Sequence, residues 1–288
     1  MYLIENYKNN IRFNNQYKEI RDFLRIIADN GYNEHFHWGR FDWMMSHSYL
    51  DVDMLSKNAL FRNESGSLVG VVLYDTSFEN RWYILHSTSE ENLLRQMIEY
   101  AVKTNTNVAT IKANLDDLAL CKLLEKMGFK MQYSEGVLEI DLSKNFSYRL
   151  PQGFYLNAPN SEIDKFQWQL VIYHGFDHKG IPEEPSKEVL KAEKHLEIPE
   201  YIKVFAIKDG EYVSHCGVWY DGGNTAYIEP VLTVPEHRGK GLGKAVVYES
   251  INRAKKQGAK RAIVLSEQKF YTNIGMTKSS EIGTWIKK

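Results

Sequence analysis

The segment VLTVPEHRGKGLGK, residues Val231–Lys244, combines the end of a strand, a glycine-rich turn and the start of a helix. Its first positions are apolar and β-branched, and Pro235 ends the strand because proline cannot donate a ladder hydrogen bond. Gly239, Gly241 and Gly243 follow, with no Cβ to keep a ligand from the backbone. Unbonded N–H groups at a helix start attract negative charge, so the segment predicts a cradle for an anion.

The charge distribution favours a small anionic ligand at this turn. Residues 1–145 hold 16 Lys+Arg and 20 Asp+Glu, residues 146–234 hold 8 and 13, and residues 235–288 hold 12 and 4. Arg238, Lys240 and Lys244 place part of this positive charge at the turn itself. The net charge of the chain is −1, which argues against a general nucleic-acid binder. Alternatively, the charge forms only a solvated helix face.

Length and composition indicate a water-soluble protein with two domains. The chain has 288 residues, and no apolar run approaches the ~20 residues needed to cross a bilayer. The N-terminus lacks the apolar core of a signal peptide, and the two cysteines are most simply reduced thiols. We therefore expect a cytoplasmic protein without a membrane partner, either a monomer or a homodimer. His35, His37 and His47 lack a recurring ligand frame, so we expect no metal.

The second half of the chain repeats the order of the first. The polar linker Ser143–Gly153 separates them, which predicts domains at 1–145 and 146–288. Leu123–Phe129 matches Phe270–Met276 in position and spacing, and the strand–helix unit Trp82–Lys103 matches Tyr227–Lys256. The pattern therefore predicts an internal duplication.

Only the second copy keeps the glycine-rich turn. Where it has HRGKGLG, the first copy has HSTSEEN, and Glu90 and Glu91 there would repel a phosphate. We therefore expect one anion site in the chain and a degenerate first domain.

Several element boundaries follow from caps and apolar periodicity. Serines at the first positions predict caps for helices Ser89–Lys103 and Ser161–Tyr173, and a further helix is expected over Ser186–Leu196. One face of the helix Ser89–Lys103 is expected to be apolar and to consist of Leu93, Leu94, Met97, Ile98 and Ala101. Asp209-Gly210 predicts a hairpin between two strands. The chain is expected to close with a strand of the second domain, Ile282–Ile286.

The motif Arg238–Gly243 resembles the Arg/Gln-x-x-Gly-x-Gly/Ala signature of the GNAT acetyltransferase superfamily. The flanking residues Thr233–His237 and Phe270–Met276 are similar to that family's neighbouring elements, and the resemblance covers residues 153–288. With a degenerate first copy, the chain resembles tandem-GNAT proteins of the mycothiol-synthase-like group. The implied fold is α/β (α+β): two tandem GNAT-like domains, each a mixed, mostly antiparallel central sheet flanked by helices.

The resemblance implies acetyl transfer from acetyl-CoA to the amine of a small molecule. The pyrophosphate of the coenzyme would lie on the turn, its pantetheine arm would pair with the strand edge, and a strand N–H would stabilise the oxyanion. The implied coenzyme-binding residues are Leu232, Thr233, Val234, Arg238, Gly239, Lys240, Gly241, Leu242, Gly243 and Lys244.

Two residues are candidates for proton transfer. Glu229 is the expected general base, because a carboxylate inside a strand that leads to the turn is unusual. Alternatively Glu229 only shapes the strand. A bulge in the strand would also change the face to which its side chain points. Tyr227 and His215 are the fallback bases. Tyr271 fits the position in this family whose hydroxyl protonates the leaving thiolate. Alternatively Tyr271 only packs, because the connection Ser266–Lys269 is shorter than the one usual in the family and would displace it.

The acceptor is expected to contact His174 and Phe176 after a helix, and Trp219 near the strand edge; the alternative is that these side chains only pack or face solvent. The competing functions are a non-catalytic acetyl-CoA sensor and a tRNA-dependent aminoacyl transferase. The intact turn and the absence of an RNA-sized basic surface count against the latter.

Overall fold

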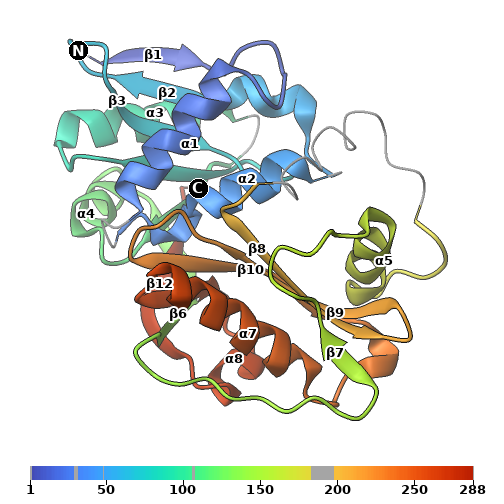
Figure 1. Cartoon of the computed structure of the whole chain (residues 1–288). Coiled ribbons are helices and arrows are strands. Elements are labelled where there is room, and N and C mark those ends of the chain that lie inside the picture. The colour runs from blue at the N-terminus through green and yellow to red at the C-terminus, as the bar shows by residue number, and fades with distance from the viewer. Residues whose placement is uncertain (1, 29–31, 48, 106–107, 183–197, 288) are drawn as a thin grey trace. The chain divides into compact units, whose positions relative to one another are not determined.

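A computed structural model describes all residues except 1, 29–31, 48, 106–107, 183–197 and 288 (Figure 1). The chain forms two compact units. The first comprises Met1–Leu138, Leu265–Thr272 and Thr277–Lys288, and the second comprises Glu139–Val264 and Asn273–Met276.

The first unit contains a sheet in the order β1-β2-β3-β4-β5-β12, continued by β6 up to Leu138. Pairing is antiparallel from β1 to β4 and between β5 and β12, whereas β4 and β5 run parallel. Its strands are β1 (Leu3–Asn6), β2 (Ala59–Arg62), β3 (Leu68–Leu73), β4 (Arg81–His86), β5 (Thr110–Asn114), β6 (Lys130–Asp141) and β12 (Thr277–Ile286). Its helices are α1 (Asn15–Ile27), α2 (Trp38–Ser46), α3 (Glu91–Thr104), α4 (Leu118–Lys126) and α8 (Lys269–Asn273), with short 3-10 turns at Glu34–Phe36 and Val52–Lys57.

Helix α3 has the predicted apolar face but not the predicted cap. Its buried residues are the five expected from the helical spacing. The helix begins at Glu91, so the prediction of Ser89 as cap was wrong. Glu90 is the N-cap residue and makes no side-chain cap bond. Its carboxylate instead accepts a hydrogen bond of 2.6 Å from the Tyr2 hydroxyl, a partner that local sequence does not reveal.

The second unit contains the strand order β11-β10-β9-β8-β7. Pairing is antiparallel from β7 to β10 and parallel between β10 and β11. This is the same arrangement as in β1 to β5. Helices α5 and α7 cover opposite faces (Figure 1). The predicted fold class is confirmed: mostly antiparallel sheet with flanking helices. The elements are β7 (Phe154–Leu156), α5 (Lys165–Gly175), β8 (Tyr201–Lys208), β9 (Glu211–Trp219), β10 (Thr225–Thr233), α7 (Leu242–Gln257) and β11 (Arg261–Leu265), with a 3-10 turn at Pro235–His237.

Of three local predictions in the second unit, one is confirmed, one was wrong and one falls outside the described residues. The hairpin at Asp209-Gly210 is confirmed, with positive φ at both residues. The Ser161 cap was wrong, because Asp164 caps α5 by accepting from two backbone amides. Ser161 lies instead 3.4 Å from the side-chain amide of Asn157. The predicted helix Ser186–Leu196 falls outside the described residues.

The C-terminal strand lies in the first unit, although the predicted division gave it to the second. Strand β12 pairs with β5 from Ile282↔Asn114 to Ile286↔Thr110. Alternating apolar residues specify a strand but not its neighbour, so the sequence could not assign this pairing. The chain first crosses from one unit to the other at Leu138/Glu139, close to the predicted boundary at 145/146.

The first unit is expected to lose stability in mild acid. Burial lowers the pKa of His35 from 6.5 to about 4, against a smaller opposite effect of Asp117. Below pH 6.5 the unfolded chain therefore takes up a proton that the folded unit does not, which costs on the order of 2 kcal/mol by pH 5. Thermal unfolding at pH 7.5 and 5.0 measures the loss. His35→Phe should reduce the pH dependence, and an unchanged dependence would show that His35 is not its source.

Candidate functional site

The glycine-rich turn has the backbone shape that its sequence predicts. A 3-10 turn over Pro235–His237 follows β10, Gly239 and Gly241 have φ of +74° and +80°, and α7 begins at Leu242. Left-handed backbone of this kind is costly for residues with a side chain. A Cβ on either glycine would meet no atom within 4 Å, so the turn is open on its outer side.

The amides of this turn are its main chemical feature. Among the described residues, the backbone N–H groups of Gly239–Lys244 have no hydrogen-bond partner. The first bonded amide in α7 is that of Ala245, 3.1 Å from the carbonyl oxygen of Gly241. Gly241 is the N-cap residue and has no side chain to satisfy the helix start. A run of donors at a helix N-terminus fits a phosphate group.

Two lysines add charge beside these amides. Lys240 Nζ lies 2.8 Å from the carbonyl oxygen of Glu236 and 3.2 Å from His237 Nδ1. Lys244 Nζ lies 5.0 Å from the ring centroid of Tyr248 in the next turn of α7. Both lysines are exposed, and their positive charge adds to that of the helix dipole.

The guanidinium of Arg238 contacts residues of the second unit around the turn. Its guanidinium donates to the carbonyl oxygens of Thr233 (2.9 Å) and Gly175 (3.0 Å) and pairs with Asp177 at 2.9 Å. These contacts tie the turn to the end of β10 and to the end of α5. Arg238 therefore holds the frame of the turn, and a direct phosphate contact stays a prediction.

Strand β10 has an open edge beside the turn. It pairs with β11 only over Thr225–Tyr227 and continues to Thr233 along β9 alone. The Val234 amide donates to the carbonyl oxygen of Val213 (3.0 Å) and so points toward β9, and the contact of Val234 with the coenzyme stays a prediction. Because successive residues of an antiparallel strand face alternate sides, the Thr233 amide faces the open edge. This edge can accept one further extended chain.

Glu229 lies at an irregularity of β10. The register with β9 shifts between Ile228 and Val231, which is the bulge considered in the sequence analysis. The Tyr227 hydroxyl donates to Glu229 Oε2 at 2.6 Å, and Trp219 Nε1 donates to the Glu229 carbonyl oxygen at 3.0 Å. The carboxylate is thus fixed on a half-buried side chain. Residues i and i+2 of a strand share a face, so the sequence spacing could have revealed the contact with Tyr227.

The fallback base His215 is fully buried and held on both sides. Its Nε2 lies 3.1 Å from the Tyr201 hydroxyl, its Nδ1 lies 3.1 Å from the carbonyl oxygen of Val204, and its ring stacks on Phe205. Burial, with smaller contributions from Cys216 and Glu229, raises the pKa of Tyr201 well above 10. Glu229 is therefore more accessible to a ligand than His215.

The comparisons with known proteins agree with this arrangement. A family model described as the acetyltransferase (GNAT) family matches residues 166–276. This segment belongs to the GNAT family. No curated protein matches the chain by sequence.

Solved structures extend the similarity in fold to nearly the whole chain. A tandem GNAT protein from the clavulanic acid biosynthesis pathway is 12% identical, with a TM-score of 0.62 and coverage of 99% of this chain and 98% of that one. A GCN5-related N-acetyltransferase from Sphaerobacter thermophilus is also 12% identical, with a TM-score of 0.58 and coverage of 99% and 95%. L-PGS from Bacillus licheniformis is 11% identical, with a TM-score of 0.55 and coverage of 98% and 93%. At such identities the likeness shows the fold alone.

The predicted acceptor residues of the GNAT segment fall into two groups. His174 and Phe176 lie at the end of α5, on either side of Gly175, whose carbonyl oxygen accepts from Arg238. The Phe176 side chain is 51% exposed. Trp219 is fully buried, with its ring stacked on Tyr201 at 4.2 Å. Trp219 therefore supports Glu229 from within the core and is not exposed to a ligand, which corrects the prediction.

Tyr271 lies on α8 and is 7% exposed. Its amide donates to the carbonyl oxygen of Gln268 at 3.0 Å, and its ring packs on Phe270. The segment Leu265–Thr272 groups with the first unit, whereas Glu229 and the turn belong to the second. The role of Tyr271 as an acid stays a prediction.

Two further observations concern metals and membranes. Among the described residues, no three His, Cys, Asp or Glu side chains are grouped as metal ligands would be. Within the same part of the chain, no helix combines the length and apolar character needed to cross a bilayer.

Proposed function

We propose that this protein is an acetyl-CoA-dependent N-acetyltransferase that acts on the amine of a small molecule by direct attack in a ternary complex. The observation that carries the proposal is the run of unbonded amides at Gly239–Lys244, next to an open strand edge on which Glu229 is fixed. Phosphate donors, a strand edge for an extended arm and a carboxylate are the groups that such a reaction needs.

The described residues fit the coenzyme along its length. The amides of Gly239–Lys244 would hold the pyrophosphate, with Lys240 and Lys244 adding charge. The edge of β10 at Thr233 would pair with the pantetheine arm, and a backbone N–H there would stabilise the oxyanion. Acetyl-CoA supplies an acetyl thioester, which is an activated acyl group.

Proton transfer falls to two side chains in this proposal. The amine must be neutral to attack, and Glu229 takes up the proton that the nitrogen loses, directly or through one water. Tyr227 keeps the carboxylate in one orientation through its hydrogen bond. Tyr271 donates its hydroxyl proton to the sulfur of the departing thiolate.

The second candidate is an acetyl-CoA sensor without turnover. One observation favours it: only Ser266–Gln268 connect the end of β11 to the start of α8, which carries Tyr271. In this case the turn would bind acetyl-CoA and no acetyl group would be transferred.

A screen of small amines with acetyl-CoA distinguishes the two functions. We expect at least one amine to release free thiol above the rate without amine, because Glu229 and the turn are both in place. Calorimetry with acetyl-CoA runs in parallel. Binding without thiol release across the library would favour the sensor, and absence of binding would contradict both candidates.

A further inference from the structure

Helix α5 ends in a backbone geometry that glycine normally provides. Asp177 has φ of +65°, and its amide donates to the carbonyl oxygen of His174 at 2.9 Å. The next amide, that of His178, donates to the carbonyl oxygen of Tyr173 at 3.2 Å. These two bonds form a Schellman motif, whose left-handed position favours glycine because glycine has no Cβ. An aspartate at this position is conformationally unfavourable, which points to a use of its carboxylate.

The carboxylate of Asp177 pairs with the arginine of the glycine-rich turn. Asp177 Oδ1 lies 2.9 Å from Arg238 Nη1. The Nη2 of the same guanidinium donates to the carbonyl oxygen of Gly175 at 3.0 Å, and its Nε donates to that of Thr233 at 2.9 Å. A rigid, planar group with several donors thus joins the end of α5 to the end of β10.

The same end of α5 packs directly on β10. A Cβ placed on Gly175 would lie 2.6 Å from Leu232 Cδ1 and 2.9 Å from Leu232 Cβ, so a larger residue would push the helix end away from the strand. The next residue, Phe176, has a side chain that is 51% exposed. The end of α5 therefore presents an aromatic side chain on a frame that packing and hydrogen bonds hold in place.

The end of α5 and the carboxylate of Glu229 lie on one face of the sheet. Register pairs and side-chain contacts link Leu232, His215, Tyr201, Trp219 and Tyr227 in that order. Directly paired residues of neighbouring strands point to the same face. Tyr227 also donates to the carboxylate of Glu229, which places that carboxylate on the face covered by the end of α5.

We infer that Asp177 and Arg238 are positioning residues for the acceptor, because their ion pair holds the end of α5, with His174 and Phe176, in a fixed place relative to Glu229. The inference rests on the proposed function. Arg238, which the motif assigns to the coenzyme, then acts on the acceptor side. An acceptor that contacts the end of α5 gains from a surface that needs no ordering on binding.

Asp177→Gly removes the carboxylate and installs the residue that this backbone position favours. We expect the KM for a reacting amine to rise about three- to fivefold, which is the range of an exposed ion pair. The kcat and the affinity for acetyl-CoA should stay unchanged, because Glu229 and the amides of the turn keep their places. A rise in KM alone marks the loss of acceptor binding, whereas a general structural defect would lower kcat and coenzyme affinity as well.

The matched control for this substitution is Asp209→Gly. Asp209 is exposed and has φ of +52° in the hairpin between β8 and β9. This hairpin contacts α5 at its opposite end, where the Tyr212 amide donates to the side-chain oxygen of Gln167. Both substitutions therefore make the same backbone change, but only Asp177→Gly removes a partner of Arg238. The KM in Asp209→Gly should equal that of the unchanged protein.

Arg238→Met tests whether the two residues act as a pair. This substitution should raise the KM for the amine at least as much as Asp177→Gly, because it also removes the bond to the Gly175 carbonyl oxygen. Adding Asp177→Gly to Arg238→Met should change the KM no further, since the carboxylate then has no guanidinium to bind. Two independent effects that multiply in the double variant would contradict the inference.

Hydrogen exchange separates failure of this inference from failure of the proposed function. The amides of Phe176, Asp177 and His178 should exchange faster in Arg238→Met, because their bonds to α5 carbonyls open more often once the helix end is released. Lys240→Met is the control, since Lys240 bonds within the turn to Glu236 and His237. It should leave these three amides unchanged.

The exchange result holds whether or not an amine reacts. Faster exchange in Arg238→Met without thiol release from any amine would support the link and contradict the proposed acetyl transfer alone. Exchange that Arg238→Met leaves unchanged would overturn the inference even if an amine reacts. An unchanged KM in Asp177→Gly with a reacting amine would overturn it as well.

Discussion

Gly241→Val is expected to weaken acetyl-CoA binding by about 100-fold or more, which corresponds to about 2.7 kcal/mol. Gly241 has φ of +80° and is the N-cap residue of α7. A β-branched side chain would oppose this conformation, and it would also stand over the unbonded amides that we assign to the pyrophosphate. Titration calorimetry with acetyl-CoA measures the change.

The matched control for this substitution is Gly222→Val. Gly222 has φ of +94° and, like Gly241, has no atom within 4 Å of an added Cβ, but it lies in the turn before β10. Both variants should lose a similar amount of stability in thermal unfolding, because both introduce the same backbone strain. Only Gly241→Val should lose affinity. Equal affinities for acetyl-CoA in the two variants would show that the turn does not bind the coenzyme.

The glycine-rich turn could be predicted because all of its determinants lie next to one another in the chain. The positive φ of Gly239 and Gly241 and the helix start at Leu242 require no distant partner. The buried face of α3 was predicted for the same reason, since helical spacing is a local property.

Features that depend on distant contacts could not be predicted. Tyr2 binds the carboxylate of Glu90 across the first unit, and Gly175 accepts from Arg238. The pairing of β12 with β5 has no local signal either. Trp219 was expected near the strand edge, but it lies between Tyr201 on β8 and Tyr227 on β10. Its burial behind Tyr201 is a tertiary property.

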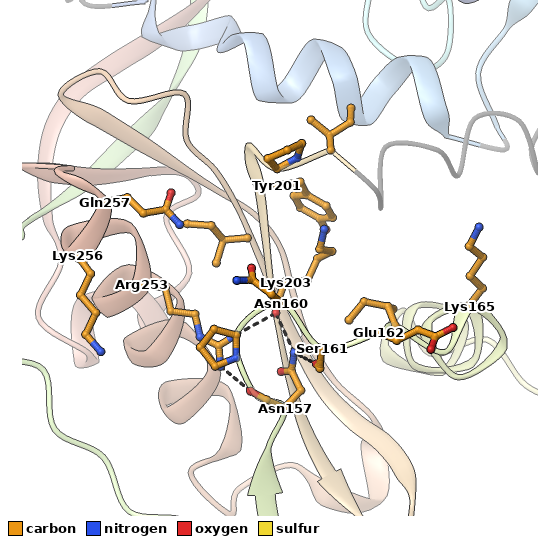
Figure 2. A pocket seen from close by; sticks show the side chains of 15 residues that line it. Asn157, Asn160, Ser161, Glu162, Lys165, Tyr201, Lys203, Arg253, Lys256 and Gln257 are labelled. Carbon is orange, nitrogen blue, oxygen red and sulfur yellow. Dashed lines mark hydrogen bonds between the residues drawn. The ribbon is translucent and has the colours of Figure 1, made fainter.

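A cavity of about 700 Å³ beside the first residues of β8 shows the same limit (Figure 2). Asn157, Lys203 and Arg253 are far apart in the sequence, and none belongs to a recognisable motif. They meet because β7 is too short to cover the edge of β8, and the Asn157 side chain makes the bonds that a strand would have made. Strand ends are among the least certain features of a sequence-based prediction, so the cavity emerged only from the structure.

Glu229→Gln is expected to lower kcat by about 10² to 10⁴, with little change in the affinity for acetyl-CoA. Glutamine keeps the size of the side chain and an oxygen that accepts from Tyr227, but it cannot take up a proton. Raising the pH should reduce the loss of kcat in Glu229→Gln, because a larger fraction of the amine is then already deprotonated in solution. Steady-state kinetics as a function of pH, with calorimetry for the coenzyme, measures both effects.

Two further variants separate proton uptake from a structural role of Glu229. Glu211→Gln removes an exposed carboxylate from the hairpin of the same unit and should keep the full rate. Tyr227→Phe leaves the carboxylate but removes the bond that orients it, so an intermediate rate is expected. If Glu229 only shaped the strand, Glu229→Gln would preserve its shape and therefore its rate, because Trp219 binds the backbone carbonyl and not the carboxylate. A rate deficit that persists at every pH would also count against a general base.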